Sequence, residues 1–107
     1  MANYEVLHGG GPFGSVTVTD TPIVVRPVTE TRRYLIMFGH PDNTVILWLA
    51  FLNPKQIIDG VVPVAEFGTP LVPGGFYEMN KDNLSTCAVY AIARATETGA
   101  IPWQEGA

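Results

Sequence analysis

The sequence predicts an all-β protein, a small antiparallel β-sandwich of jelly-roll-like or immunoglobulin-like type with about seven or eight short strands. Short runs rich in β-branched and aromatic residues recur along the chain, and turn-forming residues separate them at intervals of about 8–12 residues. No stretch has the length and apolar periodicity of a long helix. We therefore expect a flexible glycine-rich N-terminal arm over residues 1–14 and one sandwich domain over residues 15–107.

The arm begins with a short predicted strand over residues 4–7 and continues with the sequence HGGGPFG. Three consecutive glycines and a proline do not hold regular structure. Two interpretations are open. The segment is either a flexible terminus, or an arm whose apolar residues become ordered against a neighbouring molecule. Its anchors would then be Tyr4, Val6, Leu7 and Phe13.

Residues 33–51, RYLIMFGHPDNTVILWLAF, predict the dominant element, a hairpin of two apolar strands over residues 34–38 and 45–51. The polar residues between them, with Pro41 in the middle, predict a tight turn. The second strand is apolar on both faces, whereas a half-buried strand alternates. We expect one face in the core. The other face, around Ile46 and Trp48, is expected beneath another strand, the arm or a neighbouring subunit, so that Trp48→Ser weakens assembly or solubility.

The other elements follow from local patterns. The alternating run SVTVTD predicts a strand with one wet face, and Pro63 makes the strand that contains it an edge strand. Asn53 and Pro54 predict either a single helical turn or a plain loop after the hairpin. Residues 68–75 are expected to be a loop between sheets. The further strands are predicted over residues 15–20, 23–25, 61–67, 76–79, 87–93 and 100–104.

Composition favours an assembled state. The chain is 47% hydrophobic and only 15% charged, against about 25% charged in ordinary soluble domains. With a net charge of −4 and scattered basic residues, a direct nucleic-acid partner is not expected. A single cysteine, Cys87, excludes an internal disulfide. Neither a signal peptide nor a membrane span of about 20 apolar residues is recognisable, so no membrane partner is expected.

Residue patterns that carry catalysis are missing, and we expect no catalytic residue, no metal and no cofactor. Neither His8 nor His40 has a partner at metal-ligand spacing. Residues 68–80 resemble the second motif of the cupin jelly roll, but without its metal-binding histidine. Arg32 and Arg33 precede the hairpin and have two interpretations: a clamp on a partner's carboxylate, or side chains that pair with a local acid, which we favour.

Five segments taken together resemble a known group of proteins. They are SVTVTDTPIVV, TRRYLIMF, HPDNTVILWLAF, PLVPGGFYEM and CAVYAIARA, and they span about residues 15–94. This pattern is similar to the small β-sandwich virion proteins of tailed bacteriophages, namely head decoration, head-fibre-base and related accessory structural proteins. The chain departs from them in its last predicted strand, which Pro102 interrupts.

The resemblance implies a non-catalytic capsid decoration protein in the virion, made in the host cytoplasm and bound as a homo-oligomer to the major capsid protein. A trimer is favoured over a dimer because it suits three-fold capsid positions. The alternative is a carbohydrate- or receptor-binding module in which Trp103, Tyr77 or Tyr90 stacks on sugars. A small jelly-roll enzyme is a third, less favoured hypothesis. The candidate interface residues are Tyr4, Val6, Leu7, Phe13, Arg32, Arg33, Ile46, Trp48, Tyr90 and Trp103.

Overall fold

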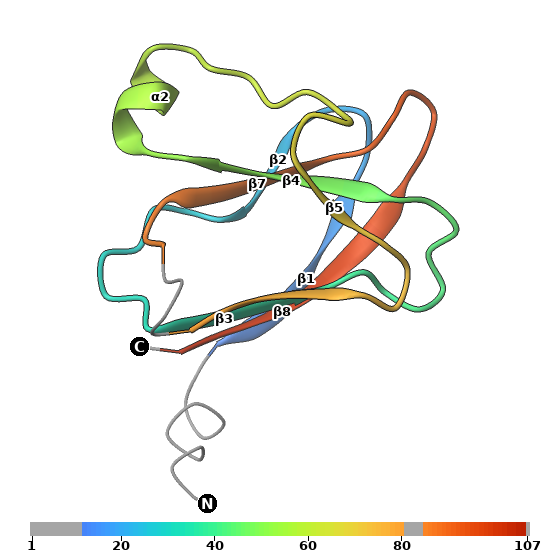
Figure 1. The fold of residues 1–107 in the computed structure, drawn as a ribbon, viewed down its shortest axis with the longest axis horizontal. Coiled ribbons are helices and arrows are strands. Elements are labelled where there is room, and N and C mark those ends of the chain that lie inside the picture. Colours follow the sequence, from blue (N-terminus) through green and yellow to red (C-terminus); the bar gives the residue numbers. More distant parts are fainter. Residues whose placement is uncertain (1–11, 81–84, 107) are drawn as a thin grey trace, which may run out of the picture.

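The computed structural model describes residues 12–80 and 85–106, and within them the chain forms a small β-sandwich of two antiparallel four-stranded sheets (Figure 1). In spatial order, sheet A consists of β1 (Phe13–Val18), β8 (Gly99–Gly106), β3 (Tyr34–Phe38) and β6 (Phe76–Met79). In spatial order, sheet B consists of β2 (Ile23–Arg26), β7 (Ala88–Ile92), β4 (Leu47–Leu52) and β5 (Thr69–Leu71). The fold class predicted from the sequence is confirmed.

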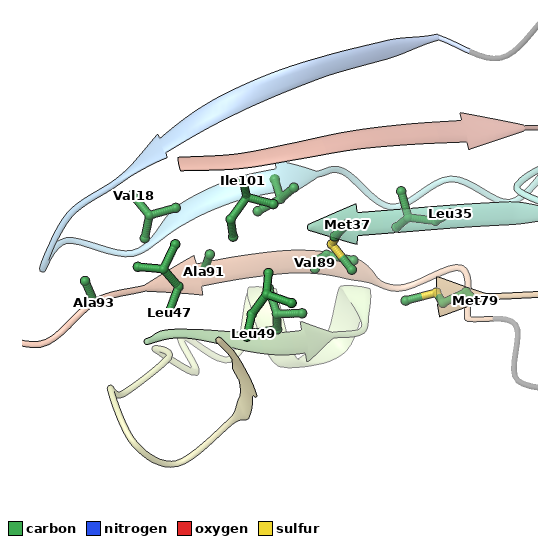
Figure 2. Packing of buried hydrophobic residues seen from close by; sticks show 12 residues of the cluster. Val18, Leu35, Met37, Leu47, Leu49, Met79, Val89, Ala91, Ala93 and Ile101 are labelled. Atoms are coloured by element: carbon green, nitrogen blue, oxygen red, sulfur yellow. The ribbon is translucent and has the colours of Figure 1, made fainter. Parts of the chain in front are cut away.

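The core lies between the two sheets, because alternate side chains of each strand point toward the opposite sheet (Figure 2). β3 contributes Leu35 and Met37, and β4 contributes Leu47 and Leu49, all of them buried. Burying each such side chain stabilises the fold by about 1.5–3 kcal/mol relative to leaving it in water. The remaining buried members of the cluster are Val18, Val25, Leu71, Met79, Val89, Ala91, Ala93 and Ile101.

The hairpin predicted over residues 33–51 is wrong, because its two strands lie in opposite sheets. β3 pairs with β8 and β6, whereas β4 pairs with β7 and β5. Each strand is therefore a central strand, with a hydrogen-bonded neighbour on both sides. On the outer face of β4, Trp48 and Ala50 lie between side chains of the two neighbouring strands and are half-buried there.

Residues 39–46 connect the two sheets, and specific contacts hold this connection in place. The Asn43 side-chain amide bonds to β8 as a backbone amide of a neighbouring strand would. Its Oδ1 accepts from Ala100 N and its Nδ2 donates to Ala100 O, both at 2.9 Å. Gly39 packs against the loop after β5. A Cβ atom at this position would lie 2.2 Å from Val72 O, so no larger residue fits. These contacts make the connection part of the sandwich.

Further differences concern the segment after β4. The helical alternative is confirmed: α2 (Pro54–Ile58) begins with a capping box in which Asn53 and Gln56 each accept from the other's backbone N–H. No strand forms over residues 61–67. The edge of sheet B is taken instead by β5, which lies in the segment predicted to be a loop.

The ends of the sandwich also differ from expectation. β1 begins at Phe13, so Phe13 and Gly14 belong to the sandwich rather than to the arm. The predicted strand over residues 4–7 lies outside the described residues. β8 runs through Pro102 without a break, because the pairing with β3 ends at Trp103 and the missing N–H breaks no bond there. Within residues 12–80 and 85–106, no helix has the length and apolar character needed to cross a membrane.

Candidate functional site

A buried ionic cluster joins the two sheets at one end of the sandwich. Its centre is Glu105 on β8, whose side chain is only 6% exposed. Glu105 Oε1 accepts from Arg26 Nη2 at 2.8 Å, and Glu105 Oε2 accepts from Arg32 Nε at 2.5 Å. The Arg32 guanidinium also donates to three backbone carbonyls, those of Pro27, Ser85 and Cys87, at 2.8–2.9 Å.

For Arg32, this cluster decides between the two interpretations given from the sequence, a clamp on a partner's carboxylate or a pair with a local acid. Arg32 is 1% exposed and donates to groups of its own chain, so it pairs with a local acid and is not available as a clamp on a partner's carboxylate. Its place among the candidate interface residues is therefore corrected. Arg33 is exposed, and its backbone N–H donates to Gly106 O at the end of sheet A.

Two further candidates from the sequence face the interior. Trp103 packs against the core, and the Arg26 guanidinium lies 4.2 Å from the centre of its ring. Tyr77 also packs against the core, with its ring 5.4 Å from that of Phe51. Ile46 is half-buried in the connection that precedes β4. Neither Trp103 nor Tyr77 stands on an outer face of the sandwich, where a flat ligand would stack on it.

A hollow of about 310 Å³ lies beside the connection between β3 and β4. Two of its polar side chains, Asn43 and His40, make hydrogen bonds that hold the fold. Asn43 is bound to β8 as described, and His40 Nδ1 accepts from Asp42 N at 3.0 Å. Within the part of the chain that is described, no three residues among His, Cys, Asp and Glu lie close enough together to hold a metal ion.

The outer face of sheet B carries Trp48 and Tyr90, both half-buried. Trp48 stands next to Ile92 of β7 and Pro70 of β5, and the Arg94 guanidinium lies 5.6 Å from its ring centre. Arg94 in turn forms an ion pair with Glu66. Trp48 is therefore flanked and partly shielded by residues of its own chain, an arrangement that the sequence did not predict.

The same face is covered further along by residues 59–68, which we call the cover segment. It follows α2 and runs back over β4 toward β5, on the side of sheet B away from sheet A (Figure 1). A shallow hollow of about 190 Å³ lies between it and two side chains of β4, Ala50 and Leu52. Gly68 closes the segment onto β4, since a Cβ atom there would lie 2.1 Å from Leu49 O.

The cover segment and the end of α2 expose apolar side chains to solvent, and four of these side chains also line the hollow over β4: Val61, Val62, Val64 and Phe67. Phe67 is 85% exposed and Ile58 is 83% exposed. Together with their exposed neighbours they form what we call the cover patch: Ile57, Ile58, Val61, Val62, Val64 and Phe67. The outer face of β4 is thus partly covered by a segment whose own apolar side chains remain exposed. Exposed apolar side chains that gather on one part of a surface are typical of interaction sites.

None of the cover-patch residues was among the candidates from the sequence. The available signal was the run VVPVAEF, which was interpreted as an edge strand because of its β-branched residues and Pro63. An apolar run that is too interrupted for a central strand can also be a loop with one side on a sheet and the other in solvent. Composition alone does not separate these two arrangements.

A second group of exposed apolar residues lies on the outer face of sheet A. Phe13 on β1 is 79% exposed, and Phe76 on β6 packs its ring 6.4 Å from that of Phe38 on β3. Phe13 is the one predicted arm anchor within the described residues. The other three, Tyr4, Val6 and Leu7, lie outside them.

On the same face, Tyr34 donates its hydroxyl proton to Glu78 Oε2 at 2.9 Å. Burial, the hydrogen bond to Glu78 and the Glu78 charge together raise the pKa of Tyr34 to about 12. Ionised Tyr34 is therefore disfavoured in the folded state relative to the unfolded chain, where its pKa is about 10. The stabilisation from neutral Tyr34 is complete below about pH 10 and is lost as the pH rises toward 12.

We expect Tyr34→Phe to flatten the alkaline loss of stability. Urea unfolding at several pH values between about 9 and 12 measures it. The wild-type free energy of unfolding should fall more steeply above pH 10 than that of the variant. Equal slopes for the two proteins would contradict the link between Tyr34 and Glu78.

Comparison of the chain with protein-family models, with curated proteins and with solved structures found no match.

Proposed function

We propose that this chain is a non-catalytic structural protein of a tailed-bacteriophage virion, a capsid decoration protein that binds the major capsid protein lattice as a homo-oligomer. The resemblance of residues 15–94 to small virion β-sandwiches suggests the class. The observation that carries the proposal is the cover patch, which supplies a surface for the lattice. The role needs no cofactor and no metal.

The cover patch has the composition of an interface core. All six side chains are large and apolar, and they stand within an eleven-residue stretch, Ile57 to Phe67. Interface cores are depleted in charge and enriched in aromatic residues. Phe67 is the most exposed member and the one aromatic ring of the patch. Its full burial against a partner would contribute about 1.5–3 kcal/mol, before the cost of association is deducted.

No observation favours the carbohydrate- or receptor-binding alternative. It rested on aromatic side chains available for stacking, and two of the three, Trp103 and Tyr77, pack against the core. The third, Tyr90, is half-buried on sheet B between Ala50 of β4 and Val24 of β2.

The experiment is co-sedimentation of the purified chain with capsids of the phage that encodes it, prepared without this protein. Wild-type chain should pellet with the particles at a fixed saturating number of copies. Phe67→Ser should bind at least about tenfold more weakly, which corresponds to the loss of about 1.4 kcal/mol. The matched control is Phe76→Ser, which removes an equally large exposed ring from sheet A and should bind like wild type.

A chain that does not pellet with such particles contradicts the proposed function. Equal binding by Phe67→Ser and wild type, with weaker binding by Phe76→Ser, would move the docking surface from the cover patch to sheet A. Circular dichroism of both variants establishes that each is folded, because both substituted side chains are mainly exposed in the wild type.

A further inference from the structure

The four edge strands of the sandwich differ in how well they are protected against pairing with another chain. β5 has three residues including Pro70, β2 has a register shift between Val24 and Arg26, and β6 has four residues including the charged Glu78. Proline, bulges, charges and shortness are the features that protect sheet edges. β1 has none of them. Its six residues, FGSVTV, contain no charge and no proline, and they pair with β8 in a continuous register.

The hydrogen bonds to β8 identify which backbone groups of β1 are free. Glu105 N donates to Pro12 O at 2.9 Å, so these two residues face each other as a hydrogen-bonded pair. In an antiparallel ladder such pairs alternate with pairs that are not hydrogen-bonded. Gly14 and Val16 therefore direct their N–H and C=O groups toward β8. The residues between and beyond them direct theirs away from the sheet: Phe13, Ser15 and Thr17.

These three residues are exposed, and no described segment pairs with them, since β1 lies at the end of sheet A. They present three N–H donors and three C=O acceptors in a row. A strand that binds there would complete a regular ladder. Unpaired strand edges of this length are the usual templates for strand addition.

We propose that β1 pairs with β1 of a second copy of this chain, antiparallel and centred on Ser15. This inference names a contact within the homo-oligomer of the proposed function and in that respect rests on it. The register centred on Ser15 uses all three outward-facing residues, in three pairs that each exchange two hydrogen bonds. The two sheets A then form one continuous sheet across the two-fold axis.

The side chains of β1 suit a strand that lies opposite itself. In this register Phe13 stands opposite Thr17 of the partner copy, an aromatic–β-branched pair of the favourable kind, and Ser15 stands opposite its own counterpart. The absence of charge on β1 matters most here, because any charged residue at the centre would face its own like charge. A net charge of −4 per copy therefore produces no direct repulsion at the contact.

Exposed apolar side chains on β2 lie on the same side of the sandwich as the free edge of β1. β1 leads through residues 19–22 into β2, the edge strand of sheet B, so both strands lie on one side. On β2, Ile23 and Val24 are 37% and 40% exposed. Ile23 stands beside the core residue Ala91, and within the described residues no strand lies beyond β2 to cover it. A second copy on the β1 edge would approach these side chains as well.

Analytical ultracentrifugation over a range of concentrations tests the proposal. The wild-type chain should form dimers by about 100 µM, and Ser15→Lys should raise the dissociation constant at least about tenfold, because it sets two like charges directly opposite each other. The matched control is Val72→Lys, which adds the same charge on the opposite side, between β5 and β6, and should associate like wild type. A monomeric wild type, or the trimer expected from the sequence with unchanged association of Ser15→Lys, would overturn the proposal.

Cross-linking tests the register itself and does not depend on Ser15→Lys being folded. In a Cys87→Ser background, Ser15→Cys should form a disulfide-linked dimer with oxidised glutathione, because a hydrogen-bonded pair brings opposite Cα atoms to about 5.5 Å, within the range of disulfides. Thr17→Cys should not, since the two positions would lie about 13 Å apart. Equal cross-linking of both variants, or of neither, would refute pairing centred on Ser15. Dimers that fail to pellet with capsids would leave this pairing intact and contradict the proposed function alone.

Discussion

Replacing Glu105 by alanine is expected to lower the free energy of unfolding by about 3–5 kcal/mol, the usual cost of removing one partner from a buried ion pair. Glu105 neutralises two guanidinium groups, and one of them, that of Arg32, has a fully buried side chain. Without the carboxylate, the Arg32 charge keeps only its carbonyl partners. The substitution also removes the tie between β8 of sheet A and Arg26 on β2 of sheet B.

An exposed ion pair in the same molecule provides the control. Glu66 and Arg94 pair on the surface, where both side chains are about half exposed. Glu66→Ala should cost only about 0.2–1 kcal/mol, because solvent screens exposed charges. Urea unfolding followed by circular dichroism measures both variants. Costs of similar size for Glu105→Ala and Glu66→Ala would contradict the assignment of the cluster as an inter-sheet support.

The strands could be predicted where the signal is local. β3 and β6 begin and end where the sequence predicts them, because apolar runs with clear turn residues on either side set their bounds. The pairing could not be predicted in the same way. β3 and β4 are neighbours in the sequence, and their spacing suits a hairpin. Yet β3 pairs with β6, and β4 pairs with β7, both more than 30 residues further along the chain. The other neighbour of β4 is the short strand β5. The local sequence pattern does not encode these contacts.

The candidate site was harder to predict than the fold. Arg32 was recognised as a side chain that needs an acid, but its partner Glu105 is 73 residues away, and the sequence does not indicate which of ten acidic residues it is. The apolar excess of β4 was also recognised. The sequence places the exposed apolar surface at Trp48 on β4, whereas the structure has it on the cover segment outside β4. The reason is that the pattern of the cover segment predicts a strand.

That error has a physical reason. A segment that covers a sheet face must be apolar on its inner side, and its β-branched residues then imitate a strand. In this chain β5 takes the edge position beside β4, and the close approach at Gly68 fixes the end of the cover segment against the backbone of β4 before β5 begins. Steric contact between backbone segments that are distant in the sequence leaves no trace in hydrophobic periodicity.

Gly68→Ala is accordingly expected to detach the end of the cover segment from β4. The new Cβ atom would lie 2.1 Å from Leu49 O and 3.0 Å from Leu49 C, and neither atom can move without disturbing a central strand. We expect a loss of about 3 kcal/mol, at the upper end of the range for overpacking. Because the segment shields Ala50 and Leu52, its displacement should also expose apolar surface of sheet B.

The comparison variant is Gly60→Ala, at the start of the same segment. Nothing lies within 4 Å of its Cβ position, so its cost arises only from the left-handed backbone, where φ is +80°, and should be about 1–2 kcal/mol. Urea unfolding measures both losses, and the fluorescence of a hydrophobic dye such as ANS reports the exposed surface. Dye binding should rise for Gly68→Ala alone. If Gly68→Ala is the more stable variant and binds no more dye than Gly60→Ala, then the cover segment is not held on β4 at Gly68, and the cover patch has no fixed base on sheet B.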